Sequence, residues 1–470
     1  MNFLLCNPEL KNDCGLHVYP HHFKPNKDYH QNIVKCAYDC LVRLKNESEI
    51  LLVAETQSGK TQVMNRLTEI ALKYKNKLKQ EGIIIDNIFI FICCSSTELK
   101  KDIVKKTEDF GLKGCMEIYH LNEIANLFIP KLARQNARVL KAMSGNCLFI
   151  FDESHADAEK TQIINQFREK LGIPIGKELT NNRKIIYISA TPYEQISAGF
   201  IPTIMEPGEG YYGFEKMIIN DRIKQSILLN NQTNIVKIFT EIFNLHGKYP
   251  KKYMLIRLPK IKGNLTITDE LKKYLRNVDY KTYDMTSKFD INMEYLDIKP
   301  QKFTIIFVFD KLRVGKSVHT ENVCCLYDTP SNANTNTTAQ SFAGRASGYN
   351  KESHNVLIYC DLEKIIEHNN WVKHKYDKEH LPKSNHVKYV DRKGDIMDKC
   401  IYSGNEYSKQ MAKKNKKNDD IHIINENEKA LEEFNKSNEN FRKFFMELTN
   451  SNIKNQSNVQ FKNCIFNLNN

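Results

Sequence analysis

The chain has 470 residues, a formal net charge of +13 and 41% hydrophobic residues. This length exceeds what one hydrophobic core usually serves, so two domains with extensions are expected. The hydrophobic content excludes a largely disordered chain, and without an apolar run of about 18 residues no transmembrane helix is expected. Because Lys and Arg (69) outnumber Asp and Glu (56), a polyanionic partner is favoured, although drift towards Lys and Asn would leave the same surplus.

The 13 cysteines are scattered along the sequence. Two adjacent pairs, Cys93-Cys94 and Cys324-Cys325, lie in apolar runs, and no pair has the C-x-x-C spacing. Such a pattern predicts buried thiols rather than a disulfide framework. The N-terminus also lacks the basic flank and apolar core of a secretion signal, so a reducing, intracellular compartment is expected.

Short β-branched apolar runs alternate with helical patterns along most of the chain. Such runs predict buried parallel strands, and their alternation with helices predicts open α/β sheets. The expected strands of the first half lie at 50–54, 83–94, 147–151 and 184–189, with helices at 61–75 and 99–110. Those of the second half lie at 253–258, 303–309, 322–327 and 355–360, with helices at 234–245 and 268–276.

A Gly- and Pro-rich loop at 206–210 separates the two sets of strands and indicates a boundary. We therefore predict an α/β protein with two tandem parallel-sheet lobes, at 29–206 and 207–372. An N-terminal segment at 1–28 precedes them. After about residue 371 the composition shifts to Lys, Asn, His and Asp, so a basic extension at 373–470 is expected to be largely helical or disordered, with an amphipathic helix near 426–448.

The first chemical motif is Thr56-Gln57-Ser58-Gly59-Lys60-Thr61, between a predicted strand and a predicted helix. That context is the one a phosphate-binding loop requires, because backbone N–H groups and the helix N-terminus attract phosphate. Lys60 is expected to contact the β- and γ-phosphates of ATP and Thr61 to ligate Mg²⁺. The usual first glycine of such loops is replaced by Ala54.

The second motif is Asp152-Glu153-Ser154-His155, directly after the apolar run 147–151. Two acids at the end of a buried strand lie at the carboxyl edge of the sheet, where α/β folds bind ligands. We expect Asp152 to hold Mg²⁺ and Glu153 to orient or activate the attacking water. Taken alone, the same residues also fit an acidic surface turn.

Two further motifs follow strands later in the chain. Ser189 and Thr191, in the sequence Ser189-Ala190-Thr191-Pro192, are expected to hydrogen-bond the neighbouring acids and transmit the nucleotide state, although alone the motif fits a strand-ending turn. The run 340–349 carries Arg345 between glycines. An Arg there can reach across a cleft and stabilise transition-state charge, or it can lie in a solvated turn.

Ordered as TQSGKT, DESH, SATP and AGRASGY, these motifs resemble superfamily 2 helicases and translocases over about residues 25–365. DESH resembles a variant of the DEAH/DExH box. The run 57–61, taken together with Gly344-Arg345 and Gly348-Tyr349, is more similar to restriction-type and viral or phage ATPases than to DEAD-box RNA helicases. The resemblance implies two RecA-like lobes with ATP in the cleft between them and nucleic acid across both. For a viral protein, it implies a viral factory or virion as location besides the cytoplasm.

The resemblance also assigns roles by order along the chain. It implies an adenine contact at Gln31 and an ATP contact at Gly315, within the loop 313–317. It implies contacts with nucleic acid at four residues: Ser95, Ser96, Thr97 and Arg257. The last motif departs from the family pattern, because Ser341 stands four residues before Arg345 where Gln or His is usual, with Gln340 one place out. Gly348 stands where a second Arg is usual.

The leading functional hypothesis is therefore an ATP- and Mg²⁺-dependent helicase or translocase acting on DNA or RNA. Its basic surplus would supply backbone affinity without sequence readout. Tyr211, Tyr212 and Trp371 are candidates for base stacking, with core packing as the favoured alternative for each. The alternative function is an ATP-gated nucleic-acid-binding subunit of a larger transcription or restriction complex, which the departures in the last motif would suit.

Overall fold

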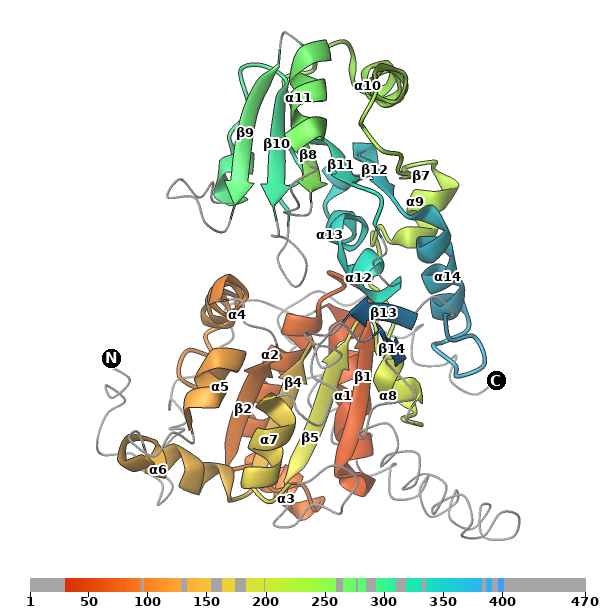
Figure 1. Cartoon of the computed structure of the whole chain (residues 1–470). Coiled ribbons are helices and arrows are strands. Elements are labelled where there is room, and N and C mark those ends of the chain that lie inside the picture. Colours follow the sequence, from red (N-terminus) through yellow and green to blue (C-terminus); the bar gives the residue numbers. More distant parts are fainter. Residues whose placement is uncertain are drawn as a thin grey trace, which may run out of the picture.

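The computed structural model describes residues 30–93, 97–127, 133–153, 163–173, 183–197, 199–258, 265–275, 278–284, 293–309, 318–331, 335–382, 386–390 and 396–400. Two α/β lobes make up most of this part of the chain (Figure 1). Lobe one is the unit built on the first six-stranded sheet, and lobe two is the unit built on the second.

Lobe one is built on an all-parallel sheet in the order β3-β2-β4-β5-β1-β6. Helices cover both faces, so its central strands are apolar on both sides and fully buried. The strands are β1 (Glu49–Ala54), β2 (Asn87–Ile92), β3 (Glu117–His120), β4 (Cys147–Asp152), β5 (Lys184–Ser189) and β6 (Pro202–Met205).

Each face of this sheet has its own hydrophobic core. One core packs the sheet against α1 (Gln31–Asn46), α2 (Lys60–Lys73) and α3 (Lys75–Gln80). The other packs it against α5 (Leu121–Leu127), α6 (Ala133–Met143), α7 (Ile163–Lys170) and α8 (Tyr193–Ser197). The helix α4 (Thr97–Asp109) packs on the end of β2 through a smaller cluster.

Lobe two repeats this architecture with the strand order β7-β12-β11-β8-β10-β9, again all parallel. The strands are β7 (Ile223–Gln225), β8 (Tyr253–Leu258), β9 (Asp279–Asp284), β10 (Thr304–Phe309), β11 (Val323–Asp328) and β12 (Leu357–Cys360). Helices α10 (Gln232–His246) and α11 (Leu265–Tyr274) cover one face. The other face carries α9 (Phe214–Ile219), α12 (Thr335–Gln340), α13 (Phe342–Ala346) and α14 (Leu362–Lys373).

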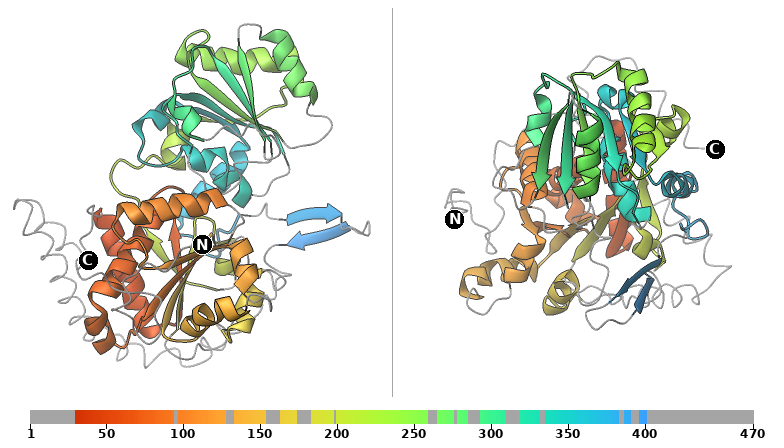
Figure 2. Two further views of the ribbon diagram at one scale, coloured as in Figure 1. Left: turned by 90° about the vertical axis from the view of Figure 1, so that its left-hand side faces the viewer. Right: turned by 45° about the horizontal axis from the view of Figure 1, so that its top comes forward.

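Short elements complete the described chain. Two 3₁₀ helices, Met293–Asp297 and Lys351–Asn355, flank strands of lobe two. Beyond α14, the antiparallel strands β13 (His386–Val390) and β14 (Ile396–Cys400) form a hairpin that projects from the rest of the molecule (Figure 2).

The predicted α/β fold with two tandem RecA-like, parallel-sheet lobes is confirmed. Each predicted strand of both lobes corresponds to an observed one, with ends that differ by a few residues. Eight described cysteines are buried thiols. None of the helices described is both long and apolar enough to span a membrane. The segment 1–28, the helix near 426–448 and most of the basic extension lie outside the described residues, and the domain boundaries stay predictions.

Candidate nucleotide site between the lobes

The strand order brings three motifs of lobe one to one edge of its sheet. β5 lies between β1 and β4, with Val53 opposite Ser189 and Ile188 opposite Asp152. Because all three strands are parallel, their carboxyl ends meet at this edge. The loop after β1, the acids after β4 and the hydroxyl residues after β5 are therefore neighbours in space, although they lie far apart in the sequence.

The loop after β1 has the backbone of a phosphate cradle. Gln57 and Gly59 have positive φ angles of 57° and 118°, and the Oγ of Ser58 donates a hydrogen bond to the carbonyl oxygen of Glu55 at 2.7 Å. A Cβ atom at position 59 would lie 2.8 Å from Cδ1 of Ile33, so this position requires glycine. The helix α2 begins at Lys60, and its first N–H groups have no acceptor within the helix.

Lys60 and Glu153 are ion-paired at the centre of this edge. The Nζ of Lys60 lies 3.2 Å from Oε1 of Glu153, and both side chains are largely buried, with 13% and 8% exposed. Glu153 has a φ angle of 55°, which is uncommon for a residue with a side chain and directs its carboxylate away from the strand axis. The lysine expected to bind phosphate and the carboxylate expected to orient water are thus in direct contact.

Asp152 is buried beside this pair and only 5% exposed. Burial, followed by the nearby Glu153 carboxylate, raises the pKa of Asp152 to about 7. Its Oδ1 atom is buried without a hydrogen-bond partner, as is the Oγ1 atom of Thr56. A buried carboxylate oxygen that lacks a partner at the end of a strand fits a Mg²⁺ ion, which prefers oxygen ligands. Thr61, the other predicted ligand, lies half-buried in the first turn of α2.

Gln340 of lobe two reaches the acidic edge of lobe one. Its Nε2 donates hydrogen bonds to Oγ1 of Thr191 at 2.6 Å and to Oε2 of Glu153 at 3.4 Å. The Oγ of Ser189 in turn accepts from the backbone N–H of Thr191 at 3.0 Å. Gln340 of lobe two thus links Thr191 to Glu153, and direct hydrogen bonds of Ser189 and Thr191 to the neighbouring acids stay a prediction.

Gln340 lies one residue before the position at which the sequence pattern led us to expect Gln or His, so it was given no role from the sequence alone. The helix α12 ends at Gln340 and α13 begins at Phe342, so Ser341 forms the break between them. At this break the Oγ of Ser341 donates to Oδ2 of Asp328 at 2.7 Å. A glutamine at the end of a short helix before a Gly-Arg pair was the available signal.

Arg345 lies in α13 and is only 3% exposed. Burial, then the nearby Arg257 guanidinium, lowers the pKa of Arg345 to about 9, while the carboxylates of Asp328 and Glu153 act in the opposite direction. Arg257 forms an ion pair with Asp328, with 2.9 Å between Nε and Oδ1. Arg257 thus lies beside the arginine motif, and its contact with nucleic acid stays a prediction.

The loop after β1 is held by contacts with residues beyond lobe one. The Nε2 of Gln57 donates to the carbonyl oxygen of Arg345 at 2.8 Å. The hydroxyl groups of Tyr211 and Tyr349 donate to loop carbonyls at 2.7 and 3.2 Å. A Cβ atom at Gly344 would lie 2.3 Å from the carbonyl oxygen of Ala339 and 3.0 Å from Cγ2 of Thr56, so the lobes meet closely at this glycine.

The remaining predicted residues are placed as follows. Gln31 is exposed in the first turn of α1, next to His30, whose ring stacks on Tyr349 with centroids 6.3 Å apart. Thr97 is the first residue of α4, and Ser95, Ser96 and Gly315 lie outside the described residues. The candidates for base stacking are buried, as the core-packing alternative predicts: Tyr211, Tyr212 and Trp371.

Two tandem RecA-like lobes, each built on a six-stranded parallel sheet, define the structural class of this chain. No protein-family model matches the sequence. Uncharacterized protein L594 of Acanthamoeba polyphaga mimivirus is 37% identical over 389 residues, which cover 80% of this chain and 96% of that protein. The chain belongs to the same family as L594.

Several solved structures are similar in fold at low sequence identity. S. cerevisiae Dbp5 bound to RNA and ADP BeF3 gives a TM-score of 0.41 with 14% identity, over 74% of this chain and 92% of that one. RecG bound to a three-way DNA junction gives 0.40 and 13%, over 83% and 50%. T. fusca Cas3 with AMPPNP gives 0.42 and 11%, over 90% and 56%. This chain therefore spans about half the length of the RecG and Cas3 chains.

Proposed function

We propose that this chain is an ATPase that couples hydrolysis between its lobes to movement on nucleic acid, as a DExH-type helicase or translocase of superfamily 2. The observation that carries the proposal is the convergence of two lobes on one set of groups. The Lys60–Glu153 pair lies at the carboxyl edge of lobe one, and Gln340 of lobe two contacts both Glu153 and Thr191. A nucleotide bound there would connect the lobes.

The phosphates of ATP would be bound by the loop Thr56–Thr61, by Lys60 and by the N-terminus of α2. Thr61 and Asp152 would hold Mg²⁺, which neutralises charge on the phosphates. ATP would compete with Glu153 for Lys60, because the phosphates carry more negative charge than one carboxylate. Glu153 would then be available to orient the attacking water and accept its proton.

Lobe two would complete the site with two buried groups. Gln340 would hold Glu153 and Thr191 in place, and Arg345 would stabilise the charge that develops on the transferred phosphoryl group. Since Gln57 contacts the backbone of Arg345, a change of the phosphate-binding loop on hydrolysis would reach lobe two directly. Gln31 and Gly315 are assigned to nucleotide contacts in the same proposal.

Nucleic acid would be bound mainly through its phosphates. The net charge of +13 supports this, and contacts by Ser95, Ser96, Thr97 and Arg257 belong to the proposal. The affinity for viral members of the superfamily is supported by the mimivirus relative, which is itself uncharacterized.

The test is a steady-state ATPase assay with and without single-stranded DNA, duplex DNA and RNA. We expect Mg²⁺-dependent turnover that nucleic acid stimulates at least severalfold. Lys60→Ala and Glu153→Gln should each abolish turnover, and Glu153→Gln should still bind ATP because its Lys60 and loop are intact. Lys79→Ala, at an exposed position of α3, is the matched control and should behave as the wild type.

Absence of any nucleic-acid-stimulated turnover would overturn the translocase proposal. ATP-dependent binding of nucleic acid without turnover would instead support the alternative, an ATP-gated binding subunit of a larger complex. Glycine at position 348, where a second arginine is usual, is the feature that favours this alternative.

A further inference from the structure

The helix α14 belongs to both lobes. Its N-cap, Asp361, directly follows β12 of lobe two, and Ile365 packs in the core of that lobe. Six residues later, Trp371 is fully buried in the core of lobe one. A helix of 12 residues is about 18 Å long, so it can span the two cores as one rigid rod. Figure 1 shows α14 running from lobe two down towards lobe one.

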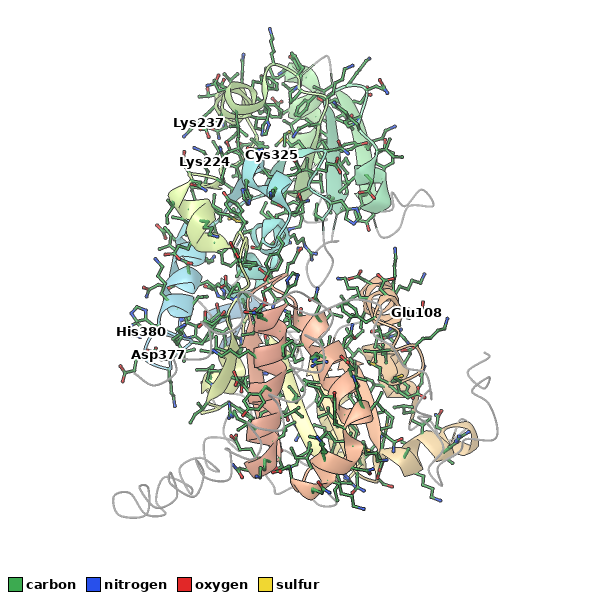
Figure 3. The ribbon with its side chains drawn as sticks, turned by 180° about the vertical axis from the view of Figure 1, so that it is seen from behind. Glu108, Lys224, Lys237, Cys325, Asp377 and His380 are labelled. Carbon is green, nitrogen blue, oxygen red and sulfur yellow. The ribbon has the colours of Figure 1, made fainter. Side chains whose placement is uncertain are left out.

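An aromatic cluster anchors the lower end of α14 in lobe one. The rings of Trp371 and Tyr193 are stacked with centroids 4.5 Å apart, and the ring of Tyr376 meets Trp371 edge-on at 5.1 Å. The indole Nε1 donates to the carbonyl oxygen of Asp377 at 2.6 Å. Asp377 lies just past the end of the helix (Figure 3). Buried stacked aromatics, here with the indole N–H of Trp371 hydrogen-bonded, make a rigid contact.

His368 adds a polar link one turn earlier in the helix. It is 2% exposed, and its Nδ1 shares a hydrogen bond of 3.0 Å with the hydroxyl of Tyr193. The ring of Phe214, in α9 of lobe two, packs edge-on against it at 5.5 Å. His368 therefore contacts a residue of each lobe.

These contacts close a ring that includes the nucleotide site. On the lobe-one side, the backbone N–H of Tyr193 donates to the carbonyl oxygen of Thr191 at 3.0 Å. On the lobe-two side, Oγ1 of Thr335, the first residue of α12, donates to Glu367 of α14 at 3.3 Å. The same α12 ends at Gln340, whose amide returns to Thr191 at 2.6 Å. The positions of Thr191 and Gln340 are thus both fixed from α14.

We propose that α14 is a positioning element for the ATPase site, and that the Tyr193–His368–Trp371 cluster is the pivot about which the lobes open and close. The inference rests on the proposed function, because it concerns how Gln340 meets Thr191 and Glu153. The hydrogen bond from Gln57 and the two from Gln340 can break as nucleotide leaves. The buried cluster stays intact and returns Gln340 to the same place in each cycle.

The first arm of the test uses paired variants of His368. His368→Asn retains a polar group near the position of Nδ1, whereas His368→Leu removes the hydrogen bond with the Tyr193 hydroxyl. We expect His368→Leu to lower kcat for ATP about tenfold, with KM changed less than twofold because the phosphate-binding groups lie in lobe one. His368→Asn should restore kcat to within about twofold of the wild type. Equal effects of both variants, or a parallel rise in KM, would overturn the inference.

The second arm uses fluorescence, because Trp371 is the only tryptophan of the chain. Its emission reports the pivot alone. We expect a blue-shifted maximum and the same weak acrylamide quenching with and without AMPPNP. Exposure of Trp371 in either state would show that the cluster opens, which contradicts a pivot.

The two arms separate the inference from the proposed function. A wild type with turnover and an unaffected His368→Leu variant would sink the pivot alone. A wild type that binds AMPPNP without turnover would sink the ATPase proposal, and the fluorescence arm would still decide on the pivot. A wild-type protein that neither binds AMPPNP nor hydrolyses ATP would overturn both the pivot and the ATPase proposal.

Discussion

The buried imidazole of His368 predicts a specific loss of stability in acid. Burial lowers its pKa from 6.5 to about 4, and the titratable group that contacts the ring is the Tyr193 hydroxyl. Since the folded pKa lies below the unfolded one, the stabilisation is complete above pH 6.5 and is lost as the pH falls from 6.5 towards 4. We expect the His368→Asn variant, which has no such proton uptake, to lose less stability in acid than the wild type.

The magnitude follows from the two pKa values. At pH 5 the unfolded chain binds a proton at this position and the folded chain almost none, which costs the wild type about 2 kcal/mol relative to pH 8. Below pH 4 the cost levels off at about 3 kcal/mol. For domains of this size, 2 kcal/mol corresponds to roughly 4 to 8 °C in Tm.

The assay is thermal unfolding of both proteins at pH 8 and pH 5, followed by circular dichroism. Other groups titrate equally in both proteins, so the informative quantity is the difference between the two pH-dependent shifts in Tm. The exposed His354→Asn variant, on the 3₁₀ helix of lobe two, is a control that should follow the wild type. Equal acid shifts in His368→Asn and wild type would refute the reasoning, because His368 would then titrate normally in the folded protein.

Three further predictions concern the nucleotide site. Asp152→Asn should raise the free energy of unfolding at pH 8 without nucleotide, by up to about 4 kcal/mol, because it removes a charge whose pKa burial raises from 3.8 to about 7; chemical denaturation measures this. Gly344→Ala should destabilise the protein by roughly 1 to 3 kcal/mol and lower turnover, since its Cβ would lie 2.3 Å from a backbone carbonyl oxygen. Gly145→Ala, whose Cβ would lie 3.4 Å from the carbonyl oxygen of Ala142, is the comparison in thermal unfolding. Gln340→Ala should reduce kcat at least tenfold while ATP binding, measured by calorimetry, changes less than threefold, because it removes the contacts with Thr191 and Glu153.

Each of these has a contrary outcome. An Asp152→Asn protein no more stable than the wild type at pH 8 would mean that the carboxylate is solvated. A Gly344→Ala protein as stable and active as Gly145→Ala would mean that the lobes meet less closely than the distances imply. Weakened ATP binding in Gln340→Ala, with kcat intact, would assign Gln340 to nucleotide binding rather than to catalysis.

The sequence predicted the architecture because buried parallel strands leave a clear pattern. The run 147–151 is apolar at every position, since both faces of β4 are covered by helices. Strands with partly exposed or polar positions were missed for the same reason: β3 is half-buried, and β9 reads Asp279-Tyr-Lys-Thr-Tyr-Asp284. A strand is recognised in a sequence by its run of buried apolar residues. Strands at the edge of a sheet have too few such residues for the run to be recognised.

The candidate site was predictable only within each motif. Lys60 could be singled out because its loop lies between a recognisable strand and a recognisable helix, and Asp152 and Glu153 because they stand at the end of a recognisable strand. The contact between Gln340 and Thr191 joins residues 149 positions apart, and no local pattern encodes it. The same holds for Trp371, whose burial was expected but whose place in the core of lobe one depends on the path of α14.

The path of α14 determines to which lobe the chain after it is attached. The polypeptide leaves lobe one after β6, builds lobe two, and comes back along α14, so Tyr376 is again part of the lobe-one core. In the proposed opening and closing of the lobes, a group attached directly after Tyr376 would move together with lobe one. A fluorophore placed directly after Tyr376 would serve as a reference fixed to lobe one. A second fluorophore on α10 or α11 would report the movement of lobe two relative to it. A chain cut before Leu362 would lose the return path and uncover Tyr193.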